Sequence, residues 1–166
     1  VTPRPALLIL GVLRLAVGFV FLWSFLDKTC GLHYSTGPSR AWINGGTPAQ
    51  SYLTGATTGK PLASFFESLA LPVTDWVFML GLLGIGLAMV LGIGTRLAAL
   101  AGVVMLGFMY AAVAPWVWGS LNPVVNEHLV DALVLILVPL TNAGDTIGLG
   151  TWWKGLGLVK KLPFLV

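Results

Sequence analysis

The chain has 166 residues, of which 57% are hydrophobic and 9% are charged, and its mean hydropathy is +0.91. Soluble globular domains carry about 25% charged residues, so this composition excludes an ordinary soluble domain and indicates an integral membrane protein. The net charge is +3, but the basic residues are scattered singly and no aromatic stripe accompanies them, so no nucleic-acid partner is expected. Cys30 is the single cysteine, which excludes a disulfide relay within the chain.

Residues 6–27 form the first predicted membrane helix. A helix needs about 20 mostly apolar residues to cross the hydrocarbon core of a bilayer, and this stretch has that length. Arg14 interrupts it and no small-residue cleavage site follows, so we expect a retained helix rather than a cleaved signal peptide. Exposing Arg14 to lipid would cost at least about 2.5 kcal/mol, so its side chain must face other helices, headgroups or water.

The connection over residues 29–72 is longer than most loops, yet it contains too many apolar side chains for a free linker. A short helix is expected to begin near Pro48, with the proline in its first turn. An amphipathic helix is expected over 60–70, with four apolar side chains on one side: Leu62, Phe65, Phe66 and Leu69. The pattern therefore predicts a helical cap over one end of the membrane helices.

Three more membrane helices are predicted, over residues 74–94, 97–118 and 126–148. The link between the second and third is so short that these two must run antiparallel. Small residues every four positions, at Gly84, Ala88 and Gly92, favour close packing of the second helix on the third. The expected fold is all-α: one domain over residues 1–166, an integral membrane antiparallel four-helix bundle with an extracytoplasmic helical cap loop.

The basic residues predict the orientation, because cytoplasmic flanks are enriched in Lys and Arg. Five fall on one side of the predicted bundle: Arg4, Arg96, Lys154, Lys160 and Lys161. Three fall on the other: Lys28, Arg40 and Lys60. We therefore expect a multi-pass protein of the cell membrane with both termini cytoplasmic and residues 29–72 extracytoplasmic.

Arg14 needs a partner within the bundle, and equal depth on the fourth helix falls near Asn142 and Asp145. The sequence predicts a pair between Arg14 and Asp145, assisted by Asn142. Such a pair is a structural clamp in one interpretation. In the other, Arg14 contacts an anion or a quinone headgroup.

A second polar group is expected at the opposite ends of the helices. His128 and Asp131 are three residues apart on the fourth helix and can form an imidazole–carboxylate pair, and Glu127 shares a face with Asp131. A quinol must exchange protons near the aqueous surface, so these three residues are the candidate catalytic groups. The candidate headgroup contacts are Trp116, Trp118, Asn126, Asp27 and Arg14. The alternative is that helix ends collect polar and aromatic residues without binding a ligand.

No spacing of histidines, cysteines and acids predicts a metal site, and no nucleotide loop, catalytic triad or haem-attachment motif is present. A redox enzyme built on this chain would need a partner subunit that carries a cofactor, or direct transfer between substrate and quinone.

Three segments resemble the DoxX-like membrane protein family, which includes the DoxD-type small subunit of thiosulfate:quinone oxidoreductase. They are residues 14–28 (RLAVGFVFLWSFLDK), 86–102 (GLAMVLGIGTRLAALAG) and 127–135 (EHLVDALVL). The resemblance implies a four-helix membrane protein with quinone-linked sulfur or thiol redox chemistry. It also raises the possibility that Cys30 forms a transient adduct with a sulfur substrate such as thiosulfate, against the alternative of an inert cysteine.

The expected function is therefore a membrane subunit of a quinone-linked oxidoreductase, with a quinone as membrane substrate and with the lipid bilayer, a redox subunit and further copies of the chain as partners. The alternative is a non-catalytic anchor that recruits redox proteins. A small-solute transporter is a weaker hypothesis, because Arg14 and Asp131 alone interrupt the apolar interior and leave no continuous polar path.

Overall fold

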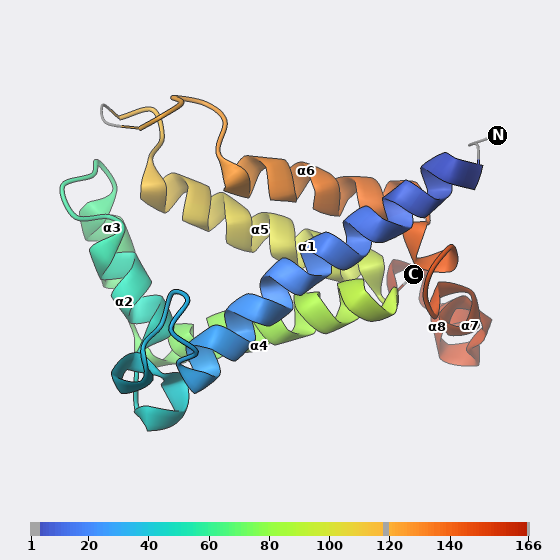
Figure 1. Cartoon of the computed structure of the whole chain (residues 1–166), viewed down its shortest axis with the longest axis horizontal. Helices are drawn as coiled ribbons and strands as arrows, with labels where there is room; N and C mark the ends of the chain where they lie inside the picture. Colours follow the sequence, from blue (N-terminus) through green and yellow to red (C-terminus); the bar gives the residue numbers. More distant parts are fainter. Residues whose placement is uncertain (1–3, 118–119, 166) are drawn as a thin grey trace.

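The structure is a computed structural model that describes residues 4–117 and 120–165, and within these residues the chain is helical with no strand (Figure 1). The longer helices are α1 (Arg4–Cys30), α4 (Pro72–Leu91), α5 (Thr95–Val113) and α6 (Glu127–Leu140). The shorter ones are α2 (Pro48–Gly55), α3 (Ala63–Ser68), α7 (Gly150–Gly155) and α8 (Gly157–Lys161). Single 3-10 turns are η1 (Pro38–Arg40), η2 (Trp42–Asn44), η3 (Ala143–Asp145) and η4 (Pro163–Leu165).

In the part of the chain that the structure describes, three helices are long and apolar enough to cross a membrane: α1, α4 and α5. The fourth expected helix, over 126–148, is shorter in the structure. α6 ends at Leu140, because Pro139 lies in its last turn and Asn142 adopts a left-handed conformation with φ of 50°. Its 14 residues extend about 21 Å, against a hydrocarbon core of about 30 Å.

The third expected helix also ends early. α5 stops at Val113, because Ala114 is left-handed with φ of 47° and a proline follows it. Trp116 therefore lies beyond the helix, and Trp118 lies outside the described residues.

The long helices pack in antiparallel neighbours. α1 lies along α4, α5 lies along α6, and further contacts join α4 to α5 and α1 to α6. The three-residue link Gly92–Gly94 turns α4 into α5, and both of its glycines have positive φ. We call this the turn end. At the other end, which we call the splayed end, α4 and α5 diverge (Figure 1).

The closest helix contact is between α1 and α4. A Cβ atom added at Gly86 would lie 2.8 Å from the backbone nitrogen of Leu22, and one added at Gly18 would lie 2.9 Å from the backbone nitrogen of Val90. Gly84 has open space around it and therefore makes no part of the expected small-residue contact between the second and third helices, whereas Gly102 of α5 faces Ile85 of α4. Because Gly18 and Gly86 have no side chains, the backbones of α1 and α4 can approach each other closely.

Arg14 is fully buried at the turn end, with 0% of its surface exposed. Its guanidinium donates hydrogen bonds to the backbone carbonyls of Met89, Val90 and Ile147, at 2.9 Å in the case of Val90. Met89 and Val90 belong to the last turn of α4, where carbonyls lack helical partners and the helix dipole is negative. Arg14 therefore caps α4 and fastens it to the segment after η3.

The expected ion pair between Arg14 and Asp145 is wrong. The Asp145 carboxylate pairs with the Lys154 ammonium at 2.7 Å, and Lys154 also donates to the side chain of Asn142 at 2.9 Å. Asp145 and Asn142 thus hold α7 to the chain that follows α6.

Both short helices expected between α1 and α4 are present, and two buried carboxylates hold this segment in place. Asp27 accepts backbone hydrogen bonds from residues 34, 35 and 36. Asp75 accepts from the backbone nitrogen of Ala49 at 2.7 Å and from Gln50, at the N-terminus of α2.

The α2–α3 segment occupies the space between the diverging helices. α2 packs against α4 and α3, and the buried ring of Phe66 on α3 packs edge-to-face on Phe108 of α5, with ring centroids 6.4 Å apart. The splayed end is therefore bridged by a segment that is itself fastened by Asp27 and Asp75.

Replacing Arg14 by methionine should destabilise the protein by about 2–4 kcal/mol, because three carbonyls lose a charged donor that water cannot replace. We expect the midpoint of thermal unfolding in detergent micelles to fall by about 5–10 °C. Arg40→Met, at an exposed position, is the matched control. An equal midpoint in the two variants would contradict the role given to Arg14.

Candidate functional site

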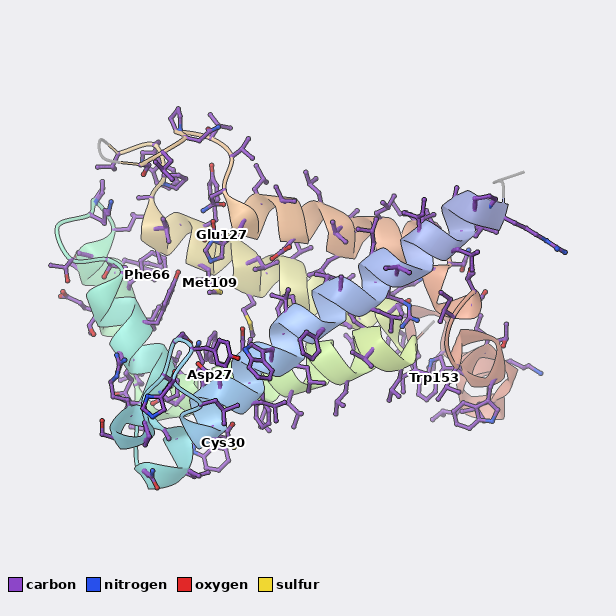
Figure 2. All side chains as sticks on the ribbon, viewed as in Figure 1. Asp27, Cys30, Phe66, Met109, Glu127 and Trp153 are labelled. Carbon is purple, nitrogen blue, oxygen red and sulfur yellow. The ribbon has the colours of Figure 1, made fainter. Side chains whose placement is uncertain are left out.

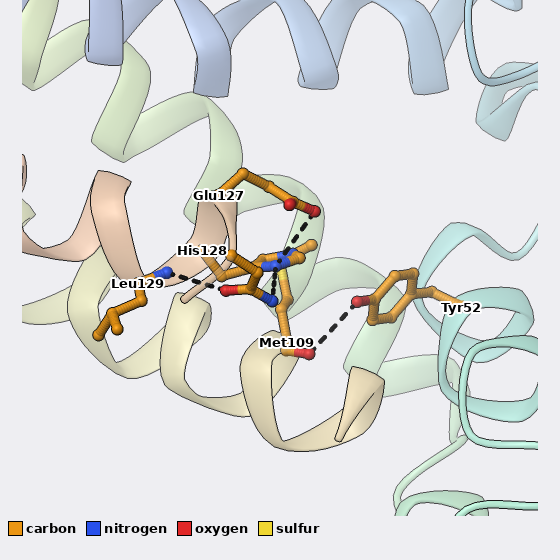
Figure 3. A network of polar contacts seen from close by, with 6 residues as sticks. Tyr52, Met109, Glu127, His128 and Leu129 are labelled. Carbon is orange, nitrogen blue, oxygen red and sulfur yellow. Dashed lines mark hydrogen bonds and ion pairs between the residues drawn. The ribbon is translucent and has the colours of Figure 1, made fainter. Parts of the chain in front are cut away.

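A cluster of polar side chains opens α6 at the splayed end (Figure 3). Asn126 is the N-cap of the helix, and its side-chain oxygen accepts from the backbone nitrogen of Leu129 at 3.2 Å. The next two residues are Glu127, whose side chain is 77% exposed, and His128, which is 7% exposed as a residue. The cluster therefore joins an exposed carboxylate to a buried imidazole.

The Nδ1 atom of His128 has two different neighbours. The side-chain nitrogen of Asn126 lies 3.2 Å from it, and Oε1 of Glu127 lies 3.5 Å from it. A neutral imidazole protonated at Nε2 can accept from Asn126, whereas an imidazolium can present its Nδ1–H to Glu127. Both protonation states of His128 thus have a partner, which is the arrangement that a proton-exchanging group needs.

Asp131 is half-buried one turn further along α6 and interacts electrostatically with His128. The structure pairs the imidazole with Glu127, however, and not with Asp131 as the spacing suggested. Glu127 is the closer carboxylate, and from the first turn of α6 its side chain folds back toward the ring (Figure 3).

Tyr52 of α2 lies near the cluster, with Met109 between them (Figure 3), and no signal in the sequence predicted a functional role for it. Its hydroxyl donates to the backbone carbonyl of Met109 on α5 at 3.5 Å (Figure 3). Burial and the negative charge of Glu127 raise the pKa of Tyr52 to about 12. The phenol therefore remains a neutral hydrogen-bond donor at every physiological pH. An aromatic residue in a cap segment carries no sequence signal that distinguishes such a donor from a packing residue.

A cavity of about 500 Å³ lies between α2, α4 and α5, beside Tyr52. It exists because α4 and α5 diverge and because small residues face it from each helix. Its lining is formed by Ala49, Tyr52, Leu53, Leu69, Thr74, Val77, Phe78, Gly81, Ile85, Ala101, Val104, Met105, Phe108 and Met109. The volume is typical of a site for a small organic ligand.

The remaining predicted site residues lie elsewhere. Asp27 and Cys30 are at the end of α1, well separated from Glu127 and Met109 (Figure 2). Asp27 is occupied in holding residues 34–36, and Cys30 is exposed. The predicted outer site therefore does not form as one unit.

Two further residues that were expected to contact the quinone headgroup, Arg14 and Trp116, do not belong to the cluster. Arg14 lies at the turn end, where it caps α4. Trp116 is 49% exposed and packs against the ring of Tyr110 at a centroid distance of 5.9 Å. The cluster thus retains four of the predicted site residues, Asn126, Glu127, His128 and Asp131. No group of three or more His, Cys, Asp or Glu side chains in the described part of the chain is placed to hold a metal ion.

The high pKa of Tyr52 can be measured from phenolate absorbance near 295 nm. The spectrum of the wild type minus that of Tyr52→Phe should titrate near pH 12, and Glu127→Gln should lower this pKa by removing a negative charge. Because the folded-state pKa exceeds the ordinary value of about 10, the contribution of Tyr52 to stability is complete below pH 10 and is lost as pH rises toward 12. A difference spectrum that titrates near pH 10 would contradict the burial of Tyr52 beside Glu127.

No protein-family model, curated protein or solved structure matches the chain. The α6 cluster and the neighbouring cavity are therefore the features of the molecule that indicate its function.

Proposed function

We propose that the chain is a membrane subunit of a quinone-linked oxidoreductase of the DoxX/DoxD type, and that Glu127 and His128 exchange protons with the quinone. The observation that carries this proposal is the double pairing of His128 Nδ1, with a donor on one side and a carboxylate on the other. The group lies at the end of helices whose outer faces are apolar, which is where a lipid-soluble substrate meets the aqueous surface.

Reduction of a quinone to a quinol takes up two protons and two electrons. The exposed carboxylate of Glu127 can receive a proton from water and pass it to the buried imidazole of His128. Asp131, one turn deeper, stabilises the imidazolium form by its charge. We place the electron donor on a partner redox subunit, or on thiosulfate or another sulfur or thiol substrate.

A non-catalytic anchor that recruits redox proteins is the second candidate. Two large side chains in the segment between α1 and α4 are strongly exposed, Tyr34 at 77% and Ile43 at 67%, and they offer a surface to a partner. Stoichiometric co-purification of a partner, together with no quinone binding, would favour this candidate.

We further propose that α6 and η3 make the fourth crossing of an antiparallel four-helix bundle and that the α2–α3 segment caps it on the extracytoplasmic side. Two observations support this topology: α6 packs against both α1 and α5, and five basic residues gather at the turn end, Arg4, Arg96, Lys154, Lys160 and Lys161. An even number of crossings puts both termini on the same side of the membrane, and the excess of basic residues indicates that this side is cytoplasmic.

Quinone binding tests the proposed function. With the full chain in lipid nanodiscs, decylubiquinone should quench tryptophan fluorescence, and His128→Ala should weaken binding about tenfold, since a hydrogen bond to an ionisable group is worth about 1.5 kcal/mol. Asp131→Asn should weaken it less, and His33→Ala at the end of α1 is the control. Equal affinity in the wild type and His128→Ala would rule out the proposed site.

The single exposed cysteine tests the topology. A membrane-impermeant maleimide added to intact cells should label Cys30, and Cys30→Ser should abolish the label. With Cys30→Ser as background, Lys160→Cys should react only after the cells are opened. Labelling of Lys160→Cys in intact cells would instead favour three crossings, with the termini on opposite sides.

A further inference from the structure

We infer that the cavity between α2, α4 and α5 is the pocket that receives the quinone ring from the lipid, and that the Tyr52 hydroxyl donates a hydrogen bond to a ring carbonyl. This inference rests on the proposed function and adds to it a place of binding, a direction of entry and a specific donor.

The cavity has an entrance on the lipid side. Val77 on α4 and Val104 and Phe108 on α5 line it and are at the same time 66%, 52% and 46% exposed. These residues belong to two of the helices that are apolar enough to span a membrane, so their exposed faces would meet acyl chains rather than water. A hydrophobic ligand can therefore enter sideways between α4 and α5 without crossing the aqueous phase.

The depth of the cavity comes from residues with little or no side chain. A Cβ atom added at Gly81 would lie 2.5 Å from the terminal methyl of Met105, so the flexible Met105 side chain lies directly against this glycine at the wall of the cavity. Ala101 on α5 and Ala49 on α2 face the same space. The pocket is therefore adjustable at Met105 and otherwise bounded by rigid helix surfaces.

The polar groups in the lining match a ligand that has a carbonyl at one end and hydrocarbon elsewhere. The Thr74 hydroxyl is already engaged, since it donates to the backbone carbonyl of Leu69 at 2.6 Å. The Tyr52 hydroxyl makes only a long bond of 3.5 Å to Met109, so it can turn toward a stronger acceptor. A hydrocarbon chain would make no use of this donor.

Both redox states of the ligand find a partner at the same place. The Tyr52 hydroxyl can donate to a quinone carbonyl, and the backbone carbonyl of Met109 can accept from the hydroxyl that replaces it in the quinol. Met109 lines the cavity and lies between Tyr52 and the pair of Glu127 and His128 (Figure 3), so a ring bound at Tyr52 would be near the proton-exchanging pair.

The test compares decylubiquinone affinity in the full chain in nanodiscs of one defined phospholipid. Ala101→Phe fills the cavity and should weaken binding at least tenfold, whereas Leu100→Phe, on the neighbouring lipid-facing position of α5 outside the cavity, should leave it unchanged. Tyr52→Phe keeps the ring and removes the donor, and should weaken binding about fivefold. Far-UV circular dichroism and the unfolding midpoint verify that each variant is folded.

The outcomes separate the inference from the proposed function. If His128→Ala weakens binding while Ala101→Phe and Tyr52→Phe do not, the quinone binds elsewhere and the inference fails although the function stands. If decylubiquinone does not bind the wild type, both fail. If Ala101→Phe removes a co-purified phospholipid, as seen by native mass spectrometry, and leaves quinone affinity unchanged, the cavity holds an acyl chain and the inference is overturned.

Discussion

A guanidinium placed inside an apolar helix is costly unless acceptors meet its charge, and the position of Arg14 follows from this requirement, since both of its terminal nitrogens donate to backbone carbonyls. Its acceptors are the carbonyls of Met89 and Val90 at the end of α4, where the helix dipole is negative, and the carbonyl of Ile147 after η3. Two glycines leave room for the guanidinium, since Cβ atoms added at Gly92 and Gly148 would lie 3.1 and 3.0 Å from its terminal nitrogens. One cation thus joins three segments that are far apart in the sequence.

This constraint acts at one end of the molecule and shapes the other. Because α1, the end of α4 and the chain after η3 are held together at the turn end, and because the turn of three residues holds α4 to α5, the helices are free to separate only at the splayed end. There the separation is bridged by α2 and α3, which Asp27 and Asp75 fasten through backbone hydrogen bonds. The cavity is what remains between the bridge and the two helices.

Hydropathy and length were sufficient to predict the helical class, three apolar helices of spanning length and the two short helices of the long connection. They were insufficient to predict which groups each side chain contacts. The carboxylate of Asp145 has the right depth to meet Arg14, but backbone carbonyls are present at every position and leave no trace in a sequence, so their competition for the guanidinium could not be read. The sequence likewise could not show that Gly86 rather than Gly84 lies at a close helix contact, because the direction in which a glycine faces depends on how each helix is rotated about its axis.

At the candidate site, the grouping of residues that are neighbours in the sequence was predictable, and the position of residues from distant segments was not. Asn126, Glu127, His128 and Asp131 are close because they share one helix start. The tyrosine near them comes from a segment more than 70 residues earlier. Asp27 and Cys30 are separated from the cluster by the divergence of the helices, which no periodicity reports, and Arg14 lies at the opposite end of the molecule.

The shortness of α6 has a consequence for the surrounding lipid. Within the fourth crossing that we propose, the α6 helix itself would extend about 21 Å, whereas the 27-residue α1 extends about 40 Å. The bilayer would have to thin beside α6 and α1 would have to tilt, so the protein would deform its membrane asymmetrically. Such hydrophobic mismatch would enrich the protein in thin regions of the membrane and draw copies together along their α6 faces, where the deformation is shared.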